Sequence, residues 1–180
     1  MDTITFIRDS IDQVQLRLMG TCDGLTQEQV EWRPAPYANN IGFILWHLAR
    51  GEDRMITQLS GRGVDLWESE SLYVQFGQPV EMPDPGDRMG LQSLAIPSLD
   101  TLIGYLGASH QKTSGFLATL SVENLAEIPE TYPRGVSIGQ ALRHLVTHKN
   151  NHHGQVDFLR GLQGPDWDLP PGTGMTLPNR

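Results

Sequence analysis

Apolar residues recur along most of this chain at alternating spacings of three and four, which is the period of one face of an α-helix. The first such run consists of Ile4, Ile7, Ile11, Val14 and Leu18. Similar runs predict three further long helices at about residues 41–59, 98–120 and 137–162. No segment of consequence alternates apolar and polar residues as a half-buried strand does. The sequence therefore predicts an all-α fold, a four-helix bundle.

Side chains that commonly cap helix N-termini stand just before these runs. They are Thr26, with Gln29 as the partner in a capping box, Asn39 or Asn40, Ser98, and Ser137, with Gln140 as the partner in a second capping box. Thr26 opens only a short helix, because two prolines follow within ten residues.

Residues 60–97 lack helical periodicity and contain many glycines and prolines. A connection of this length is either a functional lid or binding loop, or a crossover between two distant helix ends. Its aromatic residues Trp67, Tyr73 and Phe76 predict that it packs against the helices. Its length argues against a simple up-down-up-down bundle.

Length and composition restrict the domain organisation and the possible binding partners. A chain of 180 residues without repeats fits one domain, which we place at residues 1–163, followed by an extended or disordered tail at residues 164–180. The net charge of −8 and the thin spread of basic residues argue against binding to nucleic acid or to an anionic membrane.

The single cysteine, Cys22, excludes an internal disulfide framework and fits a reducing cytosol. It is predicted to lie in a turn with no histidine near it in sequence, so we do not expect it to be a nucleophile. The first residues do not resemble a signal peptide. No stretch approaches the ~18 apolar residues of a membrane span. We expect a soluble cytoplasmic protein.

The candidate chemistry is concentrated in the fourth long helix, which carries four of the six histidines: His144, His148, His152 and His153. His148 and His152 are one turn apart, and two imidazoles at this spacing can bind one metal ion. Both are predicted on the core-facing stripe of the helix, together with Ala141, Leu145, Gln155, Leu159 and Leu162. Buried imidazoles cost free energy unless they are paired, and metal coordination would offset that cost. Hydrogen-bonded core histidines are the alternative.

Two ligands from one helix make a poor metal site, so a third should come from another helix. His47 is the preferred donor because it lies in the middle of a mostly apolar face of the second long helix, and His110 on the third is the alternative. We expect His153 to face solvent, since it lies about 100° around the helix from its neighbour. His144 flanks the stripe, where we expect hydrogen bonding to a ligand or simple packing.

There is less evidence in the sequence for a functional role of the other polar residues near these histidines. Gln155 can bind a metal-held water or cap a buried carbonyl group. Glu52 and Asp53 are expected to be solvated surface charges. Arg54 and Arg62 are candidate anchors for an anionic substrate, with solvated surface arginines as the alternative.

Two motifs, set about a hundred residues apart, make the chain recognisable. The second long helix carries Asn40-Ile-Gly-Phe-Ile-Leu-Trp-His47-Leu-Ala, and the fourth carries His144-Leu-Val-Thr-His148-Lys-Asn-Asn-His152-His-Gly-Gln155. In this order and spacing, nearly the whole chain resembles the DinB/YfiT-like superfamily, which includes mycothiol-dependent maleylpyruvate isomerases and bacillithiol transferases. The resemblance implies an up-down-down-up bundle with a long crossover loop after the second helix. It also implies a homodimer, and a divalent metal ion held by His47, His148 and His152.

Three neutral imidazoles leave at least one coordination position open, as in catalytic metal sites. Such ligands suit zinc or nickel. The transferases of the superfamily imply a metal-dependent thiol S-transferase, which joins a low-molecular-weight thiol cosubstrate to a small electrophile. The alternatives are a metal-dependent hydrolase and a non-catalytic, metal-stabilised stress-response or interaction protein.

Overall fold

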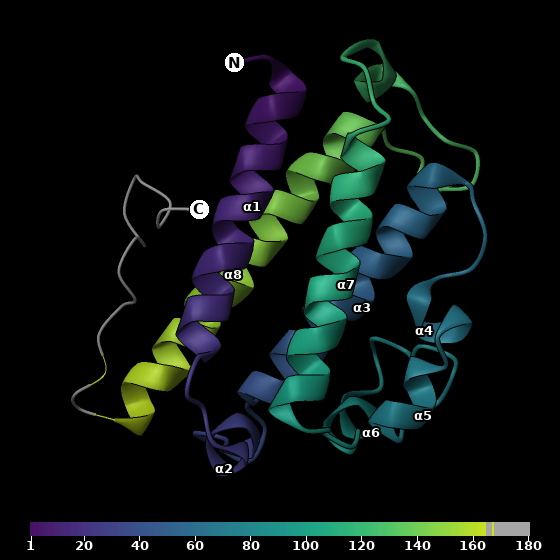
Figure 1. Cartoon of the computed structure of the whole chain (residues 1–180). Coiled ribbons are helices and arrows are strands. Elements are labelled where there is room, and N and C mark those ends of the chain that lie inside the picture. The colour runs from purple at the N-terminus through teal and green to yellow at the C-terminus, as the bar shows by residue number, and fades with distance from the viewer. Residues whose placement is uncertain (165–166, 168–180) are drawn as a thin grey trace.

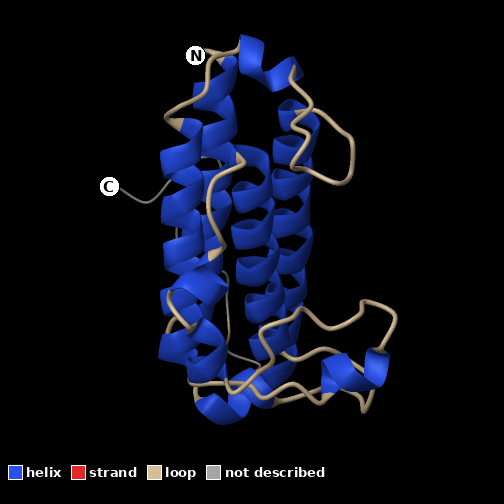
Figure 2. Ribbon diagram, turned by 90° about the vertical axis from the view of Figure 1, so that its right-hand side faces the viewer, coloured by secondary structure: helices blue, strands red, loops and turns tan. Residues whose placement is uncertain are grey.

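The computed structural model describes residues 1–164 and residue 167 of the chain. These residues form helices and loops without any strand, which confirms the all-α prediction (Figure 2). The long helices are α1 (Thr3–Cys22), α3 (Ile41–Ser60), α7 (Leu99–Leu117) and α8 (Ile138–Gln163). The short elements are α2 (Gln27–Glu31), α4 (Leu66–Ser69), α5 (Leu72–Phe76), α6 (Arg88–Gln92) and the 3-10 turn η1 (Glu123–Ala126). Apart from Gly164 and Trp167, the predicted tail at residues 164–180 lies outside the described residues.

The long helices lie side by side, with α1 packed against α8 and α3 packed against α7. In Figure 1, α1 and α8 run from top to bottom, whereas α3 and α7 run from bottom to top. Because α3 and α7 point the same way, the chain between them must return along the bundle before α7 can begin. This requirement accounts for the long connection that separates the two helices. None of the helices within residues 1–164 is long and apolar enough to cross a membrane.

The helix N-termini form where the sequence predicts them. Asn40, not Asn39, caps α3 and accepts a hydrogen bond from the backbone N–H of Phe43 at 2.8 Å. Both predicted capping boxes form, at Thr26 before α2 and at Ser137 before α8. The Asn40 cap fixes the start of α3, and therefore the rotational position of every side chain along it.

The connection between α3 and α7 is not structureless, since it contains α4, α5 and α6. As predicted, its aromatic residues pack on the bundle: Trp67 and Phe76 are buried and contact each other and the ring of Tyr105 on α7. Arg50 of α3 forms an ion pair with Asp65 and lies over the Trp67 ring. These contacts hold the connection against the bundle.

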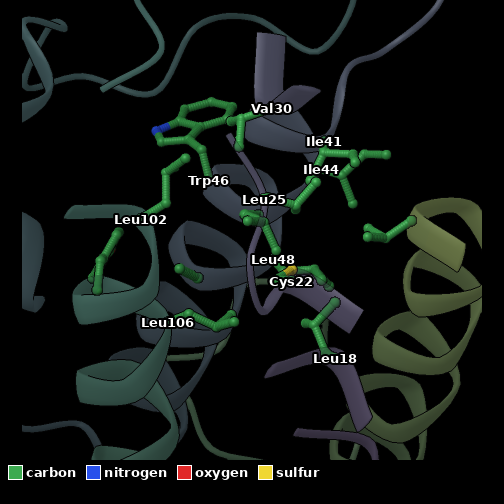
Figure 3. Close-up of a cluster of buried hydrophobic side chains, with 14 of the residues drawn as sticks. Leu18, Cys22, Leu25, Val30, Ile41, Ile44, Trp46, Leu48, Leu102 and Leu106 are labelled. Carbon is green, nitrogen blue, oxygen red and sulfur yellow. The ribbon is translucent and has the colours of Figure 1, made fainter. Parts of the chain in front are cut away.

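The core consists of two apolar clusters, one toward each end of the bundle. In the cluster nearer α2, side chains from α1, α2, α3 and α7 converge, including Leu18, Cys22, Val30, Trp46 and Leu102 (Figure 3). Cys22 ends α1 and is buried, so the prediction that it lies in a turn is wrong. Burial raises the pKa of its thiol to about 12, which leaves it unreactive at neutral pH.

A layer of polar side chains crosses the bundle between the two clusters. Glu52 accepts hydrogen bonds from Lys149 Nζ at 2.6 Å and from Thr113 Oγ1 at 2.7 Å, and Lys149 also donates to Gln15 at 2.9 Å. All four side chains are buried. The prediction of surface charges at Glu52 and Asp53 is therefore wrong. Each carboxylate is buried because a lysine from another helix, Lys149 or Lys112, compensates its charge.

Candidate metal centre

Three histidines from two helices meet at one side of the bundle. His47 comes from α3, and His148 and His152 come from successive turns of α8. Their ligand atoms all lie within 4.8 Å of one another, and each residue is half-buried. The Nε2 atoms of His47 and His148 are 3.0 Å apart. Among the described residues this is the only group of three or more histidine, cysteine or acidic side chains arranged to hold a metal ion.

The face of α8 that packs into the core differs from the predicted one. Its buried members are Ile138, Ala141, Leu142, Leu145, Lys149, His153, Val156 and Leu159. His148 and His152 lie at the edge of this face, while Gln155 and Leu162 are exposed. The core-facing side of α8 is rotated by about one residue from the predicted one, because Lys149 and His153 have buried partners on α1 and α3. At the edge of the core, the two ligand candidates remain open to a bound molecule.

The electrostatics of the cluster keep His47 and His148 neutral. Burial, reinforced by the neighbouring histidines, lowers the pKa of His47 to about 4 and that of His148 to about 3. A neutral imidazole keeps one nitrogen lone pair, which is the form that binds a metal ion. His47 and His148 can therefore bind a cation at neutral pH without first losing protons.

Gln155 fixes the orientation of one ring. Its amide oxygen lies 2.8 Å from Nδ1 of His152, and an amide oxygen can only accept a hydrogen bond. In the neutral form of His152 this contact places the proton on Nδ1 and leaves the lone pair on Nε2. This contact is not among the roles that the sequence predicts for Gln155.

The donor set fits a transition-metal ion. Nitrogen ligands at 2.0–2.1 Å from a tetrahedral metal lie roughly 3.3 Å apart, close to the observed separation of the His47 and His148 nitrogens. Three imidazole nitrogens and no carboxylate favour zinc, nickel and similar ions over magnesium or calcium. His47, His148 and His152 are thus the residues that could hold such an ion.

The remaining histidines lie outside the cluster. His110, the alternative third ligand, faces Asp12 of α1, with 3.2 Å between Nε2 and the carboxylate. His144 is exposed and packs its ring against that of His148, with centroids 5.4 Å apart. His153 is only 1% exposed, which makes the prediction of a solvent-facing residue wrong.

His153 is buried because its ring joins α8 to α1. Nδ1 accepts a hydrogen bond from Arg17 at 3.0 Å, and Nε2 lies 3.0 Å from Thr21 Oγ1 and 3.4 Å from Asp157. Burial lowers the pKa of this ring as well. A polar side chain with a partner on both nitrogens can be buried at small cost, and the spacing along α8 alone does not reveal these partners.

A cavity of about 360 Å³ opens beside His47 and His152. One wall comes from the segment before α3 and its first turns, and the other comes from the connection between α3 and α7. Its other lining residues are Tyr37, Asn39, Phe43, Trp46, Met82, Pro83, Pro85, Arg88, Leu91 and Gln92. Neither Arg54 nor Arg62, the predicted anion anchors, lines this cavity. Arg54 contacts the sulfur of Met82 at 3.5 Å, and Arg62 lines a separate cavity near Phe116 and Ile138.

Comparison with known proteins identifies a similar structure and a family for this chain. No curated protein matches the chain. Among solved structures, a conserved protein from Enterococcus faecalis superposes with a TM-score of 0.76 at 22% sequence identity, covering 90% of this chain and 97% of that one. The model of the DinB superfamily matches residues 10–156, which include the whole histidine cluster. The chain belongs to the DinB superfamily.

Proposed function

We propose that His47, His148 and His152 bind one divalent metal ion, zinc or nickel, and that the protein is a metal-dependent thiol S-transferase acting on small electrophiles. The observation that carries the proposal is the convergence of three imidazoles, from α3 and α8, beside a cavity large enough for a small molecule. Three protein ligands leave a coordination position for a further group, as catalytic sites require.

A metal ion bound here would stabilise the thiolate of a low-molecular-weight thiol at neutral pH. The thiolate attacks the electrophile, the S–C bond forms as the leaving group departs with the bonding electrons, and the thiol proton passes to solvent. The chain contributes two features to this reaction. Neutral His47 and His148 do not repel a cation, and Gln155 holds the ring of His152 in one orientation. The aromatic rings of the cavity keep the electrophile out of bulk water.

A structural role for the metal is the main alternative, since a bound ion would link α3 to α8. The apolar clusters argue against the need for such a link, because they already join these helices on both sides of the buried Lys149–Glu52 pair. A hydrolase would use the same open position for water. We also propose that the protein is a cytoplasmic homodimer, which the resemblance of its motifs and its single buried thiol support.

Metal analysis of the purified full chain tests the ligand set. We expect about one zinc or nickel ion per chain in the wild type, and loss of most of it in His47→Ala, His148→Ala and His152→Ala. His144→Ala is the matched control, because His144 is exposed on the same helix and should leave the metal content unchanged. Full metal content in His148→Ala would contradict the assignment.

Activity separates the functional candidates. The metal-loaded protein is incubated with 1-chloro-2,4-dinitrobenzene and a panel of low-molecular-weight thiols, with and without chelator. Metal-dependent thioether formation supports the transferase. Product release without any thiol would favour a hydrolase, and a large metal-dependent rise in melting temperature without turnover would favour the structural role.

A further inference from the structure

The cavity beside the histidines has an uneven charge distribution. Its lining contains no aspartate or glutamate, and its one permanently charged side chain is Arg88, at the start of α6. Most of the other lining residues are apolar or aromatic. In a protein with a net charge of −8, a cavity whose only charged lining residue is an arginine is well suited to an anion.

Arg88 is exposed, and its guanidinium makes no hydrogen bond or ion pair within the described residues. The nearest carboxylates in sequence are used elsewhere. Asp87 accepts a hydrogen bond from the backbone N–H of Gly90 at 2.9 Å, and Asp84 accepts one from Gly86 at 2.8 Å. The five donors of the guanidinium therefore remain available to a ligand.

The fold fastens α6, the helix that carries Arg88, to the segment that leads into α3. The side chain of Gln92, one turn later on α6, donates to the carbonyl of Tyr37 at 3.0 Å. Arg33 bridges the same two segments, donating to the carbonyls of Ala38 at 2.6 Å and Gln92 at 3.3 Å. These bonds join the two walls of the cavity, so that α6 is fastened to the segment that leads into α3.

The apolar part of the lining lies with Phe43 and Trp46 on α3, the helix that carries His47. The ring of Phe43 stacks on that of His47, with centroids 6.2 Å apart. Trp46 adds an indole N–H that has no hydrogen-bond partner among the described residues. A ligand that spans the cavity thus meets aromatic surface beside the histidines and a cation on the opposite wall.

We propose that this cavity binds a small carboxylate with an unsaturated or aromatic body, its carboxylate on Arg88 and its body against Phe43 and Trp46. This inference rests on the proposed function in one respect, namely that the bound carboxylate is the electrophile that accepts the thiol. In an acceptor with a C=C bond, the S–C bond forms as the C–C π bond breaks, its electron pair moves to the neighbouring carbon, and that carbon takes a proton from solvent in place of the one the thiol has released. The carboxylate end sets the orientation, and the body then directs its reactive carbon to the histidine side of the cavity. The volume of about 360 Å³ limits the substrate to a small molecule.

Calorimetric titration of the full chain with cinnamate and with its neutral amide, cinnamamide, tests the inference. We expect the wild type to bind the acid roughly five- to tenfold more tightly than the amide, the gain from a charge-assisted but partly solvated contact. Arg88→Gln should abolish this preference and leave the affinity for the amide unchanged. Arg62→Gln is the matched control, because Arg62 is equally exposed but lines a different cavity.

Each titration is repeated on metal-loaded and on chelator-treated protein, which separates this inference from the proposed function. Arg88-dependent binding of cinnamate without metal, together with no thiol transfer, would leave the carboxylate site standing while the transferase fails. Binding of cinnamate that needs the metal and ignores Arg88→Gln would place the carboxylate on the ion and overturn the inference. Equal affinities for acid and amide, or no binding of either, would overturn it as well.

Discussion

The histidine cluster shows how single residues can be suited to a ligand before the ligand arrives. Half-burial makes protonation of His47 and His148 unfavourable, which is why their pKa values fall to about 4 and about 3. The same half-burial leaves the rings within reach of a bound molecule. A fully buried histidine such as His153 instead satisfies both nitrogens inside the protein and has nothing left to offer a ligand.

These shifts predict how the stability of the metal-free protein depends on pH. In the unfolded chain each of these histidines takes up a proton near its ordinary pKa of 6.5, whereas in the folded chain His47 and His148 do so only near 4 and 3. Between these values the unfolded chain binds more protons, so the free energy of unfolding should decrease as the pH falls below about 6.5. Urea unfolding in the presence of chelator, from about pH 7 to about pH 4.5, measures this decrease.

Matched variants assign the effect to the cluster. His148→Asn removes one of the titrating rings and should make the decrease with falling pH shallower. His144→Asn, at an exposed position one turn earlier, should leave the slope as in the wild type. If wild type and His148→Asn show the same slope, the lowered pKa of His148 makes no contribution to stability and the expectation is wrong.

At the scale of helices, prediction from the sequence succeeds where the determinants are local. The caps at Asn40 and Ser137 need only residues within three positions, and both form as predicted. The buried face of α8 depends instead on residues from other helices. Lys149 is buried because Glu52, ninety-seven positions earlier, lies opposite it, and no local pattern identifies that partner. His47, by contrast, could be selected from the sequence because it interrupts an apolar face.

The buried ion pair of Lys149 and Glu52 yields a prediction about how α8 is held against α3. Lys149→Met leaves the Glu52 carboxylate buried with only Thr113 as a partner, and we expect it to lower the free energy of unfolding by about 3–5 kcal/mol. Adding Glu52→Gln to Lys149→Met removes the uncompensated charge and should recover part of this loss. Guanidinium unfolding at neutral pH measures both variants.

An exposed arginine on α8 offers a control for this substitution. Arg143→Met also replaces a long cation by methionine on this helix, but at an exposed position, and should change the free energy of unfolding by less than about 0.5 kcal/mol. A double variant that is no more stable than Lys149→Met alone would mean that lost packing, and not the unpaired carboxylate, accounts for the effect.

For the whole molecule, the direction of the helices determines where the cavity can form. Because α3 and α7 point the same way, the connection must run back along the bundle, and it supplies Met82, Pro83 and Arg88 to the cavity on its way. The sequence indicates a binding loop or a crossover at this segment, and the structure shows a crossover that also lines the cavity. The arginine of the cavity could not be chosen from the sequence, since which of several exposed arginines lines the cavity beside the histidines depends on the path of the connection.

Asp53 of α3 joins this connection to the bundle. Its fully buried carboxylate accepts hydrogen bonds from the backbone N–H groups of Leu66 and Trp67, from the hydroxyl of Tyr105 and from Lys112. Asp53→Asn replaces one acceptor oxygen by a donor, which leaves part of this set unsatisfied at a cost of about 1–3 kcal/mol. We expect the loss to be local, because α4 begins at the two N–H groups concerned. Trp67 and Tyr105 belong to the apolar cluster nearer α2, whereas the other cluster contains none of the partners of Asp53.

Hydrogen exchange followed by mass spectrometry distinguishes local from global loosening. In Asp53→Asn, amides of α4 and α5 should exchange faster than in the wild type. Amides at the centres of α1 and α8 should exchange at wild-type rates once the change in the free energy of global unfolding is taken into account. Metal content should be retained, because the three histidines lie on α3 and α8, but the affinity for cinnamamide should fall as the wall formed by residues 82–92 loosens. Asp100→Asn, an exposed aspartate in the first turn of α7, controls for loss of charge. Faster exchange throughout all four long helices would show that Asp53 stabilises the bundle as a whole and does not specifically anchor the wall of the cavity.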